Sequence, residues 1–199
     1  MNIGVFGGTF NPVHNGHVRL LERAMRAVDF DKVIILPAKI PPHKQAHQLA
    51  GGEDRVNMCR LAFKHIAAAE VSDWELKQSS KSYSVLTLRH FHSVYPDAKL
   101  YFIMGSDMLL SFHEWYRYEE ILSLASLICI SRSGSDTAQE MKKYASWLAE
   151  SGGEVIILED EPFEVSSTQI REAFKKNTDH TCYCLLYTSP SPRDRQKSR

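Results

Sequence analysis

Two histidines, three positions apart, follow the first predicted strand of the chain. That strand spans residues 3–6, and the string GGTFNPVHNGH after it ends in His14, Asn15, Gly16 and His17. We expect Asn15 to be the N-cap of the following helix, which places His17 in the first helical turn. The two imidazole rings can then converge on one oxyanion beside the positive end of the helix. The spacing therefore predicts an anion-binding loop.

The same string begins with Gly7 and Gly8. Because glycine has no Cβ, this pair is predicted to let the backbone turn tightly and bring its N–H groups close to an anion. Pro12 stiffens the loop. The string is neither a GxGxxG fingerprint nor a Walker loop, which would end in Lys followed by Ser or Thr.

A second motif, VSSTQIR, stands near the other end of the chain. Its hydroxyl residues Ser166, Ser167 and Thr168 precede a helical stretch, and Arg171 lies about one turn into it. Hydroxyls and unpaired N–H groups at a helix N-terminus can bind phosphate, and an arginine can add a two-pronged contact. Alone, the motif would suit an ordinary helix cap; together with the histidine loop it indicates a second phosphate-binding element.

The elements that must position these motifs alternate between strands and helices. The predicted strands are residues 3–6, 33–36, 70–72, 100–104, 127–130 and 155–158. The predicted helices have apolar faces within residues 18–28, 56–66, 85–95 and 136–151, and the last should end at Gly152-Gly153. Continuous apolar strands are typical of sheets buried on both faces. The order predicts an α/β fold, a Rossmann-like doubly wound parallel sheet with helices on both faces and ligands beyond the carboxyl ends of its strands.

The two motifs together resemble the paired pattern of the nucleotidylyltransferase superfamily with HxGH loops. Three further segments are similar to one branch of it, the bacterial nicotinate-nucleotide adenylyltransferases. These segments are PPHK at 41–44, GSDML at 105–109 and WYRYEEIL at 115–122, and the resemblance covers residues 1–176. A further string, SYSVLTL at 82–88, resembles the family's SYTxDTL, with Ser84 and Leu86 in place of the more usual Thr and Asp.

The resemblance implies a role for each matching residue. The catalytic groups would be His14, His17, Lys44 and Arg171, with the histidines binding the ATP phosphates and stabilising the transition state. ATP would contact Gly7, Gly8, Thr9, Phe10, His14, His17, Gly105, Asp107, Arg132, Ser166, Ser167, Thr168 and Arg171. The second substrate would contact Lys44, Ser82, Tyr83, Thr87, Trp115 and Tyr116.

The implied reaction is transfer of the adenylyl group of ATP to nicotinate mononucleotide, which gives deamido-NAD and pyrophosphate in NAD biosynthesis. Backbone N–H groups near Trp115-Tyr116 and the Thr87 hydroxyl would meet the ring carboxylate, so the acid is expected to be preferred over the amide. No side-chain metal site is expected, and Mg²⁺ would be held mainly by the ATP phosphates. Three alternatives stay open: a related enzyme such as phosphopantetheine adenylyltransferase, a nucleotide-binding module without catalysis, and a chain inactivated by its tail.

Composition limits the remaining classes. The 199 residues include 24 Lys and Arg against 24 Asp and Glu, and a net charge of zero argues against a nucleic-acid binder that relies on bulk basicity. No apolar run reaches the length of a membrane span, and the start MNIGVFGG lacks the basic region of a secretory signal. With four scattered cysteines, we expect a cytoplasmic protein that binds small molecules, acts on neither nucleic acid nor membrane, and can form an oligomer.

The tail and several polar side chains have no predicted part in the chemistry. Residues 1–176 are expected to form the nucleotidylyltransferase domain, and the tail 177–199, with two Ser-Pro steps, is expected to be disordered or non-native. Glu119 and Glu120 are expected to form a solvated helix face, and His90 and His92 to be solvated on the third helix.

Overall fold

Six parallel strands form one sheet in the computed structural model, which describes residues 1–40, 49–131, 135–159 and 165–176. The order across the sheet is β3-β2-β1-β4-β5-β6. The strands are β1 (Asn2–Gly8), β2 (Lys32–Pro37), β3 (Ala69–Val71), β4 (Lys99–Gly105), β5 (Ser126–Ser131) and β6 (Val155–Glu159). All six coincide with predicted strands, and the expected Rossmann-like doubly wound architecture is confirmed.

Four of the helices are those predicted from apolar spacing. They are α1 (Asn15–Ala27), α2 (Gly52–Phe63), α4 (Ser84–Val94) and α7 (Ser135–Glu150). The last ends just before Gly152, whose φ of +83° suits glycine, so the predicted stop signal is confirmed. The others are α3 (Trp74–Lys77), α5 (Ser106–Leu110), the 3₁₀ helix η2 (Phe112–Glu114), α6 (Tyr118–Leu124) and α8 (Ser167–Lys175).

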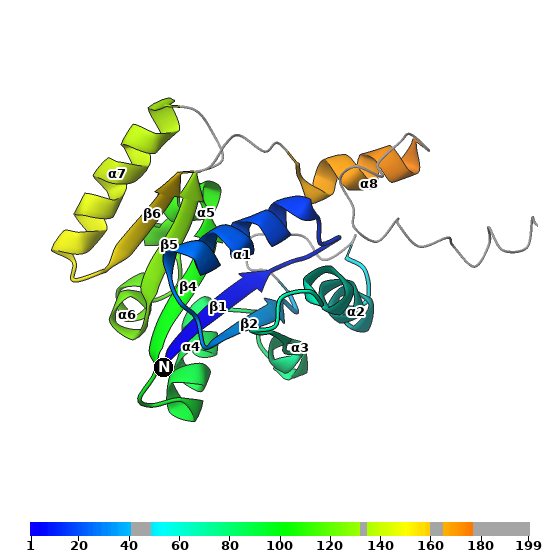
Figure 1. Cartoon of the computed structure of the whole chain (residues 1–199), viewed down its shortest axis with the longest axis horizontal. Coiled ribbons are helices and arrows are strands. Elements are labelled where there is room, and N and C mark those ends of the chain that lie inside the picture. Colours follow the sequence, from blue (N-terminus) through cyan, green and yellow to red (C-terminus); the bar gives the residue numbers. More distant parts are fainter. Residues whose placement is uncertain (41–48, 132–134, 160–164, 177–199) are drawn as a thin grey trace, which may run out of the picture.

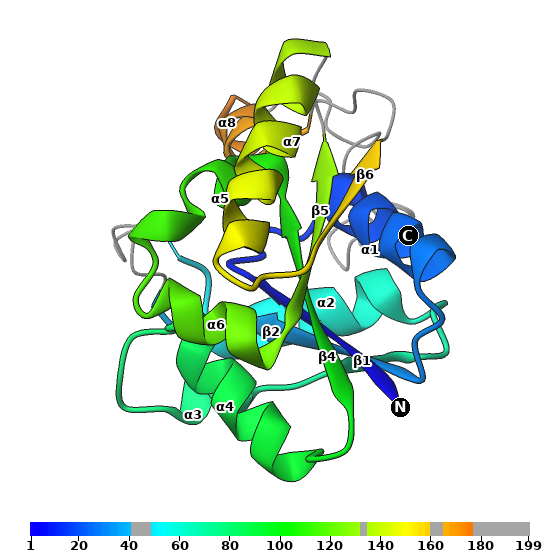
Figure 2. The ribbon, with the colours of Figure 1, turned by 90° about the vertical axis from the view of Figure 1, so that its left-hand side faces the viewer.

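The two faces of the sheet bury alternate residues of the same strands. Ile34 and Leu36 of β2 pack into a core with α4, α5, α6 and α7, whereas Val33 and Ile35 pack into a second core with α1 and α2. Figure 2 shows these two helical layers on either side of the twisted sheet. Burial on both faces explains why the four inner strands are continuous apolar runs rather than alternating ones, whereas the edge strand β3 exposes Glu70.

The strand order reverses between β1 and β4, which pair with each other. In folds of this type, ligands bind beyond the carboxyl ends of the strands at such a reversal. The loop that follows β1 leads into α1 there, and α8 lies beside that loop (Figure 1). The fold therefore brings the two predicted anion-binding motifs to one end of the sheet.

No helix within the described ranges is long and apolar enough to cross a membrane. The proposed tail, residues 177–199, lies outside the described residues, so its assignment stays a prediction.

Candidate active site

The loop after β1 differs from the prediction at its two glycines. Gly7 and Gly8 belong to β1 and pair with Leu36 and Pro37 of β2, so the pair does not form the turn. A Cβ on Gly8 would lie 2.8 Å from the ring of Phe10. The turn comes at Phe10 itself, which has a φ of +47° and a buried ring. Gly8 is therefore needed for the close packing of Phe10 over the end of the strand.

His14 and His17 lie together at the start of α1, as predicted. Their ring centroids are 3.7 Å apart, and the Phe10 ring stands edge-on to His17 at 5.0 Å. The N-cap is His14, not Asn15, which is already helical. The His14 main-chain N–H donates to His17 Nδ1 at 3.2 Å. A neutral His17 ring that accepts at Nδ1 carries its hydrogen on Nε2, and it can donate that hydrogen to a phosphate oxygen.

Helix α8 is attached to the histidine loop by side-chain contacts from its first turn. Ser167 Oγ donates to the Pro12 carbonyl at 2.9 Å, and Arg171 Nη1 donates to the Asn11 carbonyl at 2.7 Å. A Cβ on Gly16 would lie 3.0 Å from Val165 Cγ1, so glycine permits this close approach. The two motifs, predicted separately, form one structure.

The hydroxyls of this motif have different partners. Ser166 is the N-cap of α8, and its Oγ accepts from the Gln169 N–H at 3.2 Å. Thr168 Oγ1 accepts from Arg171 Nη2 at 3.0 Å. Neither α1 nor α8 carries an acidic residue in its first turn, which leaves the positive ends of both helices uncompensated. This arrangement suits polyanions.

Arg55 is a site residue that sequence reasoning missed. It is 2 % exposed, and its Nη1 donates to the carbonyls of Thr9 at 2.9 Å and Ala38 at 2.6 Å, while Nε donates to Ala50. Burial lowers the pKa of this guanidinium from its ordinary value. Arg55 thus ties the loop after β1 to the segment after β2.

A pocket of about 250 Å³ lies between α3 and α4. It contains three of the predicted substrate-binding residues, Ser82, Tyr83 and Thr87. Its wall also holds Glu75, which is 6 % exposed. The remaining lining residues are Trp74, Gln78, Ser80, Lys81, Leu86 and Arg89. The SYSVLTL string therefore lines a cavity, as the resemblance implied, whereas Glu75 was not foreseen.

The Thr87 hydroxyl and one of the backbone N–H groups expected to bind a ring carboxylate already have acceptors within the protein. Thr87 Oγ1 donates to Glu75 Oε1 at 2.7 Å, and the Trp115 N–H donates to the Phe112 carbonyl at 3.0 Å. Trp115 packs its ring against Phe112, and neither it nor Tyr116 lines the pocket between α3 and α4. The Thr87 hydroxyl is therefore not placed as the donor that we expected.

Tyr116 is nevertheless close to that pocket. Its ring centroid is 5.0 Å from that of Tyr83, which lines it, and the Tyr116 side chain is 55 % exposed. Gly105 ends β4 and caps α5, and Asp107 is exposed in the first turn of α5, beyond the central strand. Lys44 and Arg132 lie outside the described residues.

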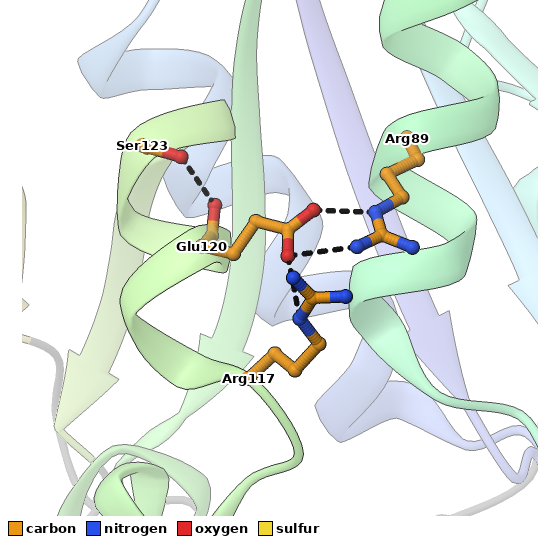
Figure 3. Close-up of polar contacts among 4 residues, drawn as sticks. All are labelled: Arg89, Arg117, Glu120 and Ser123. Carbon is orange, nitrogen blue, oxygen red and sulfur yellow. Dashed lines mark hydrogen bonds and ion pairs between the residues drawn. The ribbon is translucent and has the colours of Figure 1, made fainter.

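An ion-pair cluster joins α4 to α6 at the edge of the pocket (Figure 3). Arg89 donates to both carboxylate oxygens of Glu120, and Arg117 Nε donates to Oε2 at 2.8 Å. These contacts hold the pKa of Glu120 below its ordinary value, the hydrogen bond from Arg89 being the largest cause. The prediction of a solvated helix face is wrong for Glu120, but the neighbouring Glu119 is exposed as expected.

The two histidines of α4 also differ from one another. His92 is exposed, as predicted. His90 is half-buried and stacks on Trp74 with ring centroids 4.4 Å apart, so the prediction of a solvated side chain is wrong there. Burial lowers the pKa of His90.

No group of three or more His, Cys, Asp or Glu side chains that could hold a metal ion occurs within residues 1–40, 49–131, 135–159 and 165–176. The expectation that Mg²⁺ is held mainly by the ATP phosphates stays a prediction.

Several known proteins are similar to this chain in sequence. The cytidylyltransferase-like family model matches residues 5–173. A Clostridium tetani protein named probable nicotinate-nucleotide adenylyltransferase is 37 % identical over 177 residues, covering 88 % of each chain. A Maridesulfovibrio salexigens protein of the same name is 36 % identical over 191 residues, covering 90 % of this chain and 88 % of the other.

Solved structures show the same fold. Nicotinic acid mononucleotide adenylyltransferase of Plasmodium falciparum, complexed with NaAD, superimposes with a TM-score of 0.74 at 18 % sequence identity. The match covers 92 % of this chain and 90 % of that one. This likeness shows the fold, and the sequence relatives show the family.

Proposed function

This chain belongs to the nicotinate-nucleotide adenylyltransferase family, and we propose that the joined histidine loop and α8 carry out its reaction, the transfer of the adenylyl group of ATP to nicotinate mononucleotide. The observation that carries the assignment is the attachment of α8 to the loop through Ser167 and Arg171. That attachment places two helix N-termini, two imidazoles and a guanidinium at one end of the sheet.

The nucleophile is the 5′-phosphate of the mononucleotide, which attacks the α-phosphorus of ATP in line. The new P–O bond forms as the bond to the β-phosphate oxygen breaks, and pyrophosphate leaves. Because the nucleophile is already an anion, no strong base is needed. The protein must align two anions and stabilise the charge that develops on the α-phosphate and the leaving group.

The histidines are suited to stabilising the charge that develops on the α-phosphate. His17 donates from Nε2, because its Nδ1 accepts the His14 N–H. The His14 ring, whose centroid lies 3.7 Å away, and the edge-on Phe10 ring limit the orientations open to His17. A donor fixed before the substrate arrives costs little reorganisation in the transition state.

The first turn of α8 is suited to the leaving pyrophosphate. Its N–H groups, the Thr168 hydroxyl and Arg171 form a set of donors for the β- and γ-phosphates, whereas the Ser166 hydroxyl already donates to Gln169 Oε1 at 3.1 Å. Mg²⁺ would arrive with ATP and be held by phosphate oxygens and water, neutralising part of the same charge. Lys44 and Arg132 would complete the set.

Two of the three alternatives that the sequence left open are disfavoured, and inactivation of the chain by its tail stays open. The whole-chain relatives favour nicotinate mononucleotide over phosphopantetheine as the acceptor. A binding module without catalysis would not need the fixed donor geometry of His17. Oligomer formation, a cytoplasmic location and the absence of nucleic-acid and membrane partners stay predictions.

The deciding experiment measures pyrophosphate release from ATP and Mg²⁺ with nicotinate mononucleotide, nicotinamide mononucleotide or phosphopantetheine as the acceptor. We expect activity with nicotinate mononucleotide, and a kcat/KM for the acid roughly tenfold to a hundredfold above that for the amide. Since Thr87 donates to Glu75, this preference must come from other donors. Equal values for acid and amide would contradict the preference, and no release with any acceptor would contradict the function.

A further inference from the structure

A carboxyl group is buried in the wall of the pocket between α3 and α4, and the mechanism above does not use it. Glu75 is 6 % exposed. Burying a carboxyl group costs free energy unless the protein supplies hydrogen bonds to it. The partners of Glu75 therefore indicate why it is there.

Two hydroxyl side chains stabilise this carboxyl group. Thr87 Oγ1 donates to Glu75 Oε1 at 2.7 Å, and Ser82 adds a smaller side-chain interaction that favours the ionised form. Burial raises the pKa of Glu75, whereas both hydrogen bonds and the attraction of Arg55 oppose that rise. The partners thus favour the charged form that burial disfavours.

Ser82 extends the network to the segment after β2. Its Oγ accepts from the Lys39 N–H at 2.9 Å, and its own N–H donates to the Ile40 carbonyl at 3.2 Å. Ser82 precedes α4, and Thr87 lies in the first turns of α4. Glu75 therefore interacts with both side chains that connect α3, the segment after β2 and the start of α4, and it accepts the Thr87 hydrogen bond.

We propose that Glu75 is the positioning residue of the mononucleotide pocket, holding the hydroxyls of Ser82 and Thr87 with their hydrogens turned toward itself. The inference rests on the proposed function, because it assigns the pocket to the acceptor substrate. The substrate then meets the oxygen lone pairs of both side chains rather than their hydrogens. The same contacts fix where α4 begins relative to α3.

Replacing Glu75 with Gln tests the arrangement with almost no change in volume. The amide has one acceptor oxygen and two N–H donors, so one hydroxyl would face a donor and lose its partner. We expect the KM for nicotinate mononucleotide to rise roughly tenfold, with the KM for ATP unchanged. Glu53→Gln, an exposed site on α2, is the matched control and should leave both constants unchanged.

A second pair of variants makes the test independent of whether the Glu75→Gln variant folds. Thr87→Val keeps the shape but removes the hydroxyl, and should also raise the KM for the mononucleotide. Thr87→Ser keeps the donor and should retain a KM near that of the wild type. The effects of Glu75→Gln and Thr87→Val should not add in the double variant, because both break the same contact.

The outcomes separate this inference from the function itself. A wild-type enzyme without adenylyl transfer would overturn the proposed function. An active wild type whose Glu75→Gln variant shows equal changes in both KM values, or none, would overturn the positioning role. Where Glu75→Gln does not fold, a Thr87→Ser variant as impaired as Thr87→Val would overturn it instead.

Discussion

The Arg171 guanidinium donates a hydrogen bond of 2.7 Å to the main-chain carbonyl of Asn11, 160 positions earlier in the chain. The same guanidinium donates to Thr168 through its other terminal nitrogen. One side chain thus connects α8 with the loop after β1. The planar guanidinium can keep both hydrogen bonds while its remaining N–H groups donate to a phosphate.

Replacing Arg171 with Lys should impair both binding and turnover. An ammonium group is a point charge and cannot reproduce the planar pair of donors. We expect kcat/KM for ATP to fall at least roughly tenfold, in line with the loss of a charge-assisted hydrogen bond. Steady-state kinetics with varied ATP would measure this, with Lys175→Arg in the last turn of α8 as the control. Unchanged KM and kcat would contradict the phosphate role.

The role of His17 can be divided between its two ring nitrogens. His17→Ala should lower kcat by about 10²–10³, the usual cost of one transition-state donor, with a smaller effect on ATP binding. It should also lower Tm, because the His14 N–H loses its acceptor. His17→Asn places an oxygen near the Nδ1 position, so it should retain more of the Tm yet be as slow as His17→Ala.

The control for these His17 variants is His92→Ala, at an exposed site on α4. Turnover near that of the wild type in His17→Ala would contradict the catalytic assignment. A Tm in His17→Asn as low as that in His17→Ala would contradict the capping role of Nδ1.

The sheet and four of its helices could be predicted because each carries a regular apolar pattern. The inner strands are buried on both faces, and α1, α2, α4 and α7 are long enough to show a helical period. Helix α3 has 4 residues and α5 has 5, which is little more than one turn. Such segments have no period to detect, and packing against the sheet decides their conformation.

The catalytic motifs were predictable for a local reason. His14, His17 and the first turn of α8 are contiguous strings whose residue types suit phosphate. Only the contact between the strings is non-local. The N-cap was misplaced by one residue because a His side chain is an uncommon cap, whereas Asn is a preferred one.

The structural roles of Arg55 and Glu120 could not be predicted from the number and sign of the charges in the sequence. Arg55 precedes Cys59 by one helical turn, so its spacing places it on the buried face of α2, and that was a usable signal. Glu120 gave no such signal, because its partner Arg89 is 31 positions away. Glu75 was hidden in the same way by its dependence on Thr87, 12 positions later.

Replacing Arg55 with Lys should destabilise the protein and weaken the binding of both substrates. Lys cannot reach the carbonyls of Thr9, Ala38 and Ala50 together, so buried acceptors would lose their partners. We expect a loss of about 2–4 kcal/mol in the free energy of unfolding, measured by urea denaturation. Arg60→Lys, exposed on the same helix, is the control. A variant with normal stability and kinetics would show that Arg55 does not brace the loop.

The Glu120 ion pairs should make stability depend on pH in acid. The contacts with Arg89 and Arg117 lower the pKa of Glu120, so the folded state favours the ionised form. A carboxyl group with a lowered pKa stabilises the fold above its unfolded pKa, about 4.3, and the contribution is lost as the pH falls through the folded pKa. Both arginines stay charged throughout this range.

Glu120→Gln should therefore melt at a lower temperature than the wild type at pH 7, with the difference shrinking as the pH is lowered below about 4. Thermal unfolding at several pH values would measure this, and added salt should reduce the difference at pH 7 because the cluster is partly exposed. Glu119→Gln serves as the control, since its carboxylate is exposed on the same helix. A Tm difference that stays constant from neutral to acid pH would mean that Glu120 stabilises α6 by packing rather than by charge.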